Sequence, residues 1–142
     1  MNVQELRDKY LGVPYRHKGR SLEALDCWGL IVFIYRDFGI EVIDLEDYDE
    51  NWSVKGRNYF IENYYKKWQA HGAPAYLDLV MFENSKGIPY HAGVYLSKGE
   101  FIHCCKAGTV IGKLFDKKWQ ERLVGLYRYD GVLFAPNGEK LC

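Results

Sequence analysis

The stretch "DCWGLIVFIYRDFG" at residues 26–39 decides how this chain folds. It is strongly apolar and long enough for several helical turns, so it predicts a helix buried in the centre of the molecule. Asp26 is a good N-cap and Gly39 a typical C-terminal stop, which puts Cys27 in the first turn. A buried cysteine is usually just a small apolar residue. The role of Cys27 therefore depends on whether the chain supplies a base for its thiol.

The length and composition predict one ordinary globular domain over residues 1–142. The chain is 48% apolar and contains 14 glycines, and its length is sufficient to bury a core. Its 19 basic and 19 acidic side chains cancel to a formal net charge of zero, which argues against nucleic acid as a partner. No apolar run approaches the roughly 20 residues of a membrane span, which argues against a membrane partner.

The N-terminal segment and the cysteines indicate where the protein is made. "MNVQELRDKY" at residues 1–10 is polar and lacks the apolar region of a signal peptide, so we expect synthesis in the cytoplasm without an export signal. The four cysteines, at positions 27, 104, 105 and 142, suggest no disulfide framework. We therefore expect a reducing compartment.

Helical patterns come first along the chain, and strand patterns follow. Apolar residues recur at helical spacing over residues 3–10 and 56–70, and residues 11–21 read as a loop. Strand patterns occupy residues 77–83, 91–96, 100–105, 108–114 and 123–129. This order predicts an α+β fold, with N-terminal helices packed on a C-terminal antiparallel sheet of about five strands.

The stretch "HAGVYLSKGEFIHCC" at residues 91–105 predicts a hairpin. A three-residue loop, 97–99, would place Gly99 in the left-handed conformation that such loops require. The cross-strand pairs are then Leu96 with Glu100, Tyr95 with Phe101, Val94 with Ile102, and Gly93 with His103.

This register places His91 and His103 on one face, together with Phe101 and Cys105. The residues between them are apolar and form the opposite face, which belongs to the core. The two imidazoles become diagonal neighbours, close enough to interact. A two-residue loop would instead put the histidines on opposite faces.

A thiol at a helix start beside imidazoles can act as a nucleophile. The partial positive charge of a helix N-terminus and an adjacent imidazolium both favour the thiolate and lower the pKa of a cysteine. A Cys–His pair, with a third group orienting the imidazole, is the arrangement of papain-like peptidases. The order Cys27, His91, His103 fits that arrangement.

Nearly the whole chain resembles the NlpC-type family of cell-wall cysteine peptidases, which have a papain-like fold, and specifically its short phage and prophage members. "YLGVPYRHKG" (10–19) resembles a family loop that ends in an aromatic residue and a glycine pair, and "DCWGL" (26–30) resembles the nucleophile motif. "YLDLVMF" (76–82) is similar to the first sheet strand, "HAGVYL" (91–96) to the base strand, and "EFIHC" (100–104) to the strand with the third polar residue.

The resemblance implies a role for each residue of the site. Cys27 would be the nucleophile, His91 the general base and acid, and His103 the residue that orients His91. Tyr15 would line the oxyanion hole together with the backbone N–H of Cys27. The implied reaction is hydrolysis of an amide bond in peptidoglycan stem peptides, beside D-glutamate and a diamino acid, with no metal and no other cofactor.

Three positions depart from the commonest family pattern. Trp28 stands where a serine is usual, Lys18 replaces the first glycine of the pair, and Leu77 replaces a glycine before Asp78. In many relatives the aspartate and the following serine help to bind the free amine of the substrate, so Asp26 and Trp28 are the candidate substrate-binding residues. Trp28 either packs under the rim of the site or forms a wall for the substrate.

Other functions remain open at this point. The chain could be a structural subunit of phage tail assembly with a vestigial active site, which would make tail proteins its partners and the virion its location. It could also carry out acyl transfer. A zinc site of Cys27, His91, His103 and Cys105 lacks the short ligand pairs of structural zinc. An active peptidase would reach the cell wall in a phage tail or through lysis.

Overall fold

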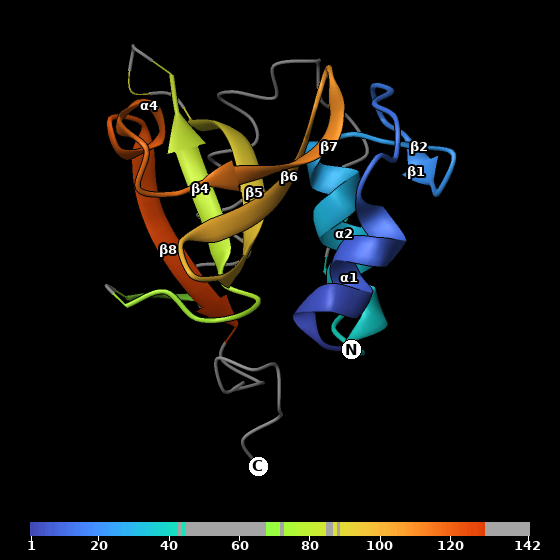
Figure 1. The fold of residues 1–142 in the computed structure, drawn as a ribbon, viewed down its shortest axis with the longest axis horizontal. Helices are drawn as coiled ribbons and strands as arrows, with labels where there is room; N and C mark the ends of the chain where they lie inside the picture. Colours follow the sequence, from blue (N-terminus) through green and yellow to red (C-terminus); the bar gives the residue numbers. More distant parts are fainter. Residues whose placement is uncertain (43, 45–67, 72, 85–86, 88, 130–142) are drawn as a thin grey trace.

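The computed structural model describes residues 1–42, 44, 68–71, 73–84, 87 and 89–129. Two helices lie on one side of the molecule, and an antiparallel sheet lies on the other (Figure 1). The predicted α+β architecture is confirmed.

Both predicted N-terminal helices that fall within the described residues are present. Helix α1 spans Val3–Tyr10 and begins with a capping box, in which the Asn2 side chain accepts from the Glu5 N–H and the Glu5 carboxylate accepts from the Asn2 N–H. Helix α2 spans Cys27–Asp37, and Asp26 is its N-cap, as predicted. The chain leaves α2 through Gly39, whose φ of 76° is left-handed.

The main sheet has six antiparallel strands in the order β3-β8-β4-β5-β6-β7. Its strands are β3 (Trp68–His71), β4 (Leu79–Glu83), β5 (Pro89–Ser97), β6 (Glu100–Cys105), β7 (Gly108–Lys113) and β8 (Leu123–Tyr129). Five of these match the five predicted strands to within two residues at each end. Two short strands, β1 (Arg20–Ser21) and β2 (Ala24–Leu25), form a small separate hairpin, and a short helix, α4 (Lys117–Gln120), precedes β8.

The sixth strand corrects part of the helix predicted over residues 56–70. Residues 56–67 lie outside the described part of the chain, but residues 68–70 belong to β3, which pairs with β8. The prediction is wrong for these three residues because pairing with a partner strand overrides a weak local periodicity.

The hairpin of β5 and β6 differs from the predicted one in its loop. The pairs Val94–Ile102 and Tyr95–Phe101 are as predicted, but Glu100 pairs with Ser97 instead of Leu96. The turn has only two residues, Lys98 and Gly99, both left-handed with φ of 53° and 78°. A bulge between Tyr95 and Ser97 adds one residue to β5, which offsets the shorter loop and keeps the predicted register beyond it.

The two faces of the sheet carry two separate clusters of buried side chains. Helix α2 packs on β5 and β6, and the first cluster joins its apolar residues to Ala92, Val94 and Ile102. The second cluster lies among the residues that alternate with these and includes Phe82 and Phe101. This alternation confirms the predicted core face of the hairpin.

Candidate active site

Cys27 is the first residue of α2 and is 8% exposed. Helix α2 begins at the end of the sheet where β5 starts and β6 ends, and it packs against both strands (Figure 1). The Cys104 thiol donates to the backbone carbonyl of Leu25, with Sγ and O 3.2 Å apart. The residue before the helix cap is therefore bonded to Cys104 on β6, which directly follows His103.

Asp26 holds the start of α2 and the preceding loop together. Its Oδ1 accepts from the Gly29 N–H at 2.7 Å and from Arg20 Nη1 at 2.8 Å, and its Oδ2 accepts from the Lys18 N–H at 2.9 Å. The side chain is 3% exposed. Arg20 also forms a bidentate ion pair with Asp44. Both oxygens of Asp26 are thus committed to positioning the loop on the helix.

The glycine of the "DCWGL" motif is explained by this close approach. A Cβ on Gly29 would lie 2.5 Å from the Gly19 carbonyl oxygen and 2.8 Å from Arg20 Nη1. No real side chain tolerates such distances to backbone, so the loop can lie against the first turn of α2 only if position 29 has no side chain.

The departures at Lys18 and Leu77 keep the backbone of the residue that they replace. Lys18 has a φ of 60° and Leu77 a φ of 73°, both in the left-handed region that glycine favours. The resemblance places a glycine at each of these positions. Both residues thus have a backbone conformation that glycine would adopt without strain.

Tyr15 lies beside the residues that lead into α2. It forms an isolated parallel bridge with Leu25, supported by hydrogen bonds from Arg16 N–H to the Leu25 carbonyl and from Leu25 N–H to the Pro14 carbonyl. The Tyr15 side chain is half-buried. The structure thus brings the predicted oxyanion-hole residue against Leu25, two residues before Cys27.

His91 on β5 and His103 on β6 are in direct contact, as the register predicts. The His91 Nε2 and His103 Nδ1 atoms are 2.8 Å apart, and the two rings are nearly perpendicular at 78°. Both side chains are buried. Gly93 leaves room for this contact, because a Cβ there would lie 3.1 Å from the Cβ of His103.

Burial determines the charge of both imidazoles. Burial, with a smaller contribution from the neighbouring His103, lowers the pKa of His91 to about 3. Burial also lowers the pKa of His103 to about 4, with a smaller contribution from the Lys118 ammonium. Both rings are therefore neutral at neutral pH, and each has one nitrogen that donates and one that accepts.

Four aromatic side chains lie around the histidines, and one of them is Tyr90, whose ring centroid lies 5.8 Å from that of His91. Phe82, Phe101 and Trp119 each have a ring centroid within 6.2 Å of an imidazole centroid. The predicted register had already placed Phe101 on the face of the histidines, and alternation could also have found Phe82, since it is the cross-strand partner of His91. No comparable signal pointed to Trp119, which comes from the four-residue helix α4.

The structure favours packing as the role of Trp28. This side chain is 1% exposed and belongs to the core cluster between α2 and the sheet. Among the described residues, no group of three or more histidine, cysteine, aspartate and glutamate side chains could hold a metal ion. Nor does the described part of the chain include a helix both long and apolar enough to cross a membrane.

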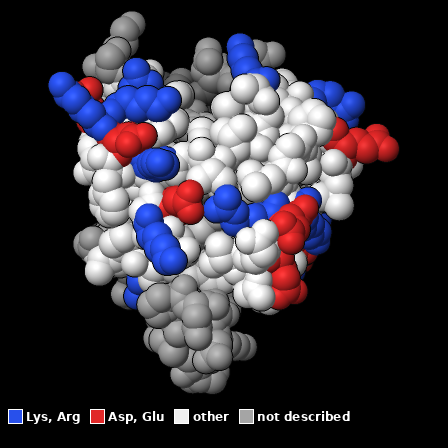
Figure 2. All heavy atoms as spheres, viewed as in Figure 1, with Lys and Arg blue, Asp and Glu red and all other residues white. Residues whose placement is uncertain are grey.

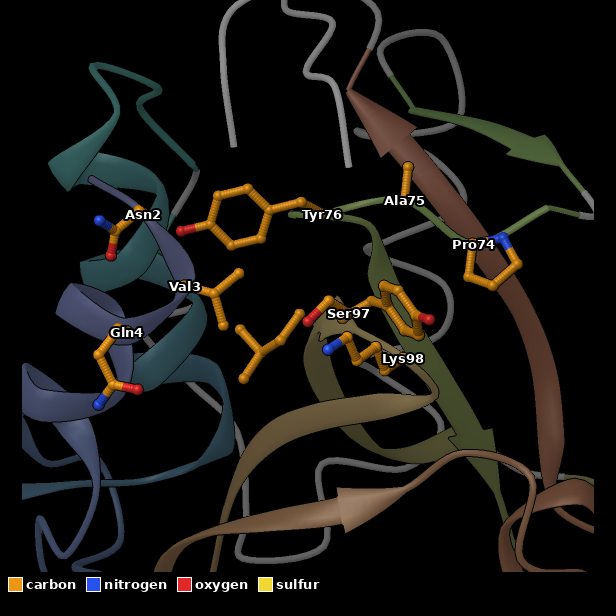
Figure 3. Close-up of a pocket in the computed structure, with 10 residues that line it drawn as sticks. Asn2, Val3, Gln4, Pro74, Ala75, Tyr76, Ser97 and Lys98 are labelled. Carbon is orange, nitrogen blue, oxygen red and sulfur yellow. The ribbon is translucent and has the colours of Figure 1, made fainter. Parts of the chain in front are cut away.

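The surface offers a pocket at the other end of the sheet. It has a volume of about 560 Å³ and lies between the start of α1 and the end of β5. Figure 3 shows Tyr76 pointing across it toward Asn2 and Val3 on α1; the Tyr76 hydroxyl donates to the Met1 carbonyl at 3.2 Å. Neither Cys27 nor either histidine lines it, so it is separate from the candidate site. On the face drawn in Figure 2, acidic and basic side chains lie next to one another.

A helix that begins with Cys27 packs on an antiparallel sheet that carries the two histidines, and comparison with known proteins agrees with the fold of a papain-like domain. The model of the NlpC/P60 family matches residues 12–128, and the chain belongs to this family.

Two relatives and one solved structure illustrate the likeness. The chain is 30% identical over 134 residues to the gamma-DL-glutamyl hydrolase of Bacillus subtilis (strain 168), a match covering 92% of this chain and 29% of that protein. It is 29% identical over 128 residues to the tail tip assembly protein K of Escherichia phage lambda, covering 85% and 62%. It therefore spans less than two thirds of either relative. A crystal structure of an NlpC/P60 family protein from Bacillus cereus superposes with a TM-score of 0.67 at 24% identity, covering 89% and 40%.

Proposed function

We propose that this chain, as a single domain, is a cysteine peptidase that hydrolyses an amide bond in peptidoglycan stem peptides, beside D-glutamate and a diamino acid. The observation that carries the proposal is the contact between His91 and His103, two buried and neutral imidazoles on the strands against which the helix that bears Cys27 packs. A neutral, oriented imidazole at this place has the chemistry of a general base.

The orientation of the histidine pair supports distinct roles for the two rings. If His91 Nε2–H donates to His103 Nδ1, the Nδ1 atom of His91 keeps its lone pair for the thiol proton of Cys27. His103 then acts only as the acceptor that fixes the tautomer and the orientation of His91.

The reaction then proceeds in two halves. His91 takes the proton of Cys27, and the sulfur attacks the amide carbon of the substrate. The resulting oxyanion is held by the Cys27 N–H and the Tyr15 hydroxyl. His91 gives its proton to the leaving amine, the C–N bond breaks, and a thioester remains. Water then attacks this thioester, His91 takes the water proton and returns it to the sulfur, and the carboxylic acid product leaves.

Asp26 and Trp28 are assigned to support of the site instead of contact with the substrate. Asp26 uses both carboxylate oxygens within the protein, and Trp28 is almost completely buried. Recognition of a free amine by the Asp26 carboxylate would require one of these hydrogen bonds to be given up.

Digestion of purified muropeptides, followed by mass spectrometry of the fragments, tests the reaction. We expect the wild-type protein to release fragments cut between D-glutamate and the diamino acid, and Cys27→Ala to release none. Cys105→Ala is the matched control and should keep most of the activity. Cleavage by Cys27→Ala at the wild-type rate, or no cleavage by the wild type, would contradict the proposal.

A second candidate function is structural participation in a phage tail, with or without hydrolysis. The match to a tail tip assembly protein over 85% of this chain favours it. Tails assembled with Cys27→Ala separate the two functions. Normal assembly and infection with this variant would indicate a structural role, whereas normal assembly with impaired penetration of the cell wall would indicate that a tail-borne peptidase is needed.

A further inference from the structure

Trp119 is the ring that touches both histidines from the side of α4. Its centroid lies 6.2 Å from that of His91 with the rings near parallel at 24°, and 5.1 Å from that of His103 with the rings near perpendicular at 79°. It also packs on Phe82 at 4.7 Å and on Phe101 at 5.2 Å. One indole thus contacts both imidazoles, and its plane is near parallel to that of His91 and near perpendicular to that of His103.

The backbone around α4 fixes this indole on the sheet. On its N-terminal side, the Leu114 N–H donates to the Gly99 carbonyl in the turn between β5 and β6. On its C-terminal side, the Arg122 carbonyl accepts from the Glu83 N–H on β4. The short helix is therefore tied to the turn of the hairpin that bears the histidines and to β4, the neighbour of β5, although four residues alone would not make a stable helix.

We propose that Trp119 is a positioning residue that holds the imidazoles of His91 and His103 perpendicular to each other and so maintains the hydrogen bond between them. The proposal rests on the proposed function only for its consequence in catalysis. A planar ring stacked on one imidazole and meeting the other by its edge restricts the rotation of both about their side-chain bonds. It also occupies the space from which water would otherwise reach the rings.

The charged and titratable groups near the pair come from three elements. Lys118 on α4 places its ammonium 4.9 Å from the indole centroid and acts on His103. Tyr90 on β5 has its ring 5.8 Å from that of His91, and its hydroxyl accepts from Arg122. Cys27 belongs to α2, which packs on both strands. Removal of the indole would change hydration without removing any of these charges.

The test is nuclear magnetic resonance of labelled histidines in the full chain, comparing Trp119→Phe with Trp119→Leu. We expect Trp119→Phe to keep the wild-type tautomers and low pKa values, because it retains a ring. In Trp119→Leu, the pKa of His91 should rise by about one unit or more toward its ordinary value, and the ring should lose its single tautomer. Phe115→Leu is the control, since Phe115 is 66% exposed and lies four residues away.

The kinetics of cleavage give a second measurement. A residue that only stabilised the fold would not change the pH–rate profile. In Trp119→Leu, kcat should fall about tenfold or more with KM little changed, and the acid limb of the pH–rate profile should move upward with the His91 pKa. Should Trp119→Leu not fold, Trp119→Met replaces it with the same expected shifts.

The readouts separate the two proposals. Wild-type histidine tautomers and titration in the leucine or methionine variant would overturn the positioning role. A histidine shift in that variant, with no muropeptide cleavage by the wild type, would support the positioning role and overturn the peptidase function.

Discussion

The two halves of the candidate site are held by opposite kinds of forces. The start of α2 is held by polar contacts, in which the Asp26 carboxylate binds two backbone N–H groups and the Arg20 guanidinium. The histidine pair is held by aromatic rings, chiefly Phe82, Phe101 and Trp119. The hydrogen bonds of Asp26 fix the direction of the amide groups at the start of the helix. The apolar surroundings of the histidines, in contrast, lower the pKa of the imidazoles. The proposed nucleophile and the proposed base therefore lie in different environments.

The largest expected effect separates the two histidines within the aromatic half. His91→Asn should lower cleavage by about 10²–10⁴-fold, because an amide cannot take up and return a proton. His103→Gln should keep partial activity, since its amide oxygen can still accept from His91, and His103→Ala should lie between the two. Muropeptide cleavage rates measure this ranking. Equal losses at both positions would indicate that His103 takes part directly in proton transfer.

The next effect measures the polar half. Asp26→Ala should lower the free energy of unfolding by about 3–5 kcal/mol, because it removes the buried partner of Arg20 and of two backbone N–H groups. The control is Asp44→Ala, which removes the more exposed partner of the same arginine and should cost about 1 kcal/mol or less. Urea denaturation gives both values. Similar losses in the two variants would show that burial of Asp26 does not matter.

The pH dependence of stability tests whether the apolar surroundings keep the two imidazoles neutral. The pKa of His91 is lowered to about 3 and the pKa of His103 to about 4, both below the ordinary value of about 6.5 in an unfolded chain. The unfolded state therefore binds more protons below about pH 6.5, and the folded state loses stability as the pH falls through this range.

Between pH 7 and pH 5 we expect the two histidines to cost the wild type about 3–4 kcal/mol. The loss should be smaller in the double variant His91→Gln/His103→Gln, measured by the same denaturation. An equal pH dependence in the two proteins would mean that the imidazoles are not held neutral.

The smallest effect concerns the loop that the polar half positions. Lys18 has the left-handed backbone of a glycine, so Lys18→Gly should raise the free energy of unfolding by up to about 1 kcal/mol. Arg16→Gly, at an exposed neighbour without a left-handed backbone, should instead lower it by about 0.5–1 kcal/mol. Thermal unfolding compares the two, and a loss in both variants would contradict the strain at Lys18.

The sequence predicted the histidine contact better than the loop that produces it. The alternation of apolar residues sets which face of each strand is buried, so His91 and His103 had to share a face once the core face was assigned. The turn at Lys98 and the bulge at Leu96 offset each other, and neither leaves a separate signal in the residue pattern. The prediction reached the right register with the wrong loop length.

Contacts that depend on tertiary packing were beyond the sequence. Trp119 comes from a helix too short to show a period, and the residues around that helix are held by hydrogen bonds to Gly99 in the β5–β6 turn and to Glu83 on β4. The ion pair between Arg20 and Asp26 joins the predicted loop of residues 11–21 to the helix cap. The cap itself was predictable, because it requires only a local side-chain contact.

The central claim is that Cys27 attacks the substrate, and chemical inactivation tests it most directly. The wild-type protein is treated with iodoacetamide at a pH below the ordinary cysteine pKa of about 8.5, and muropeptide cleavage and cysteine labelling are followed together by mass spectrometry. We expect activity to fall in step with the addition of one carbamidomethyl group to Cys27, before Cys105 is labelled. Full labelling of Cys27 with activity retained would contradict the account.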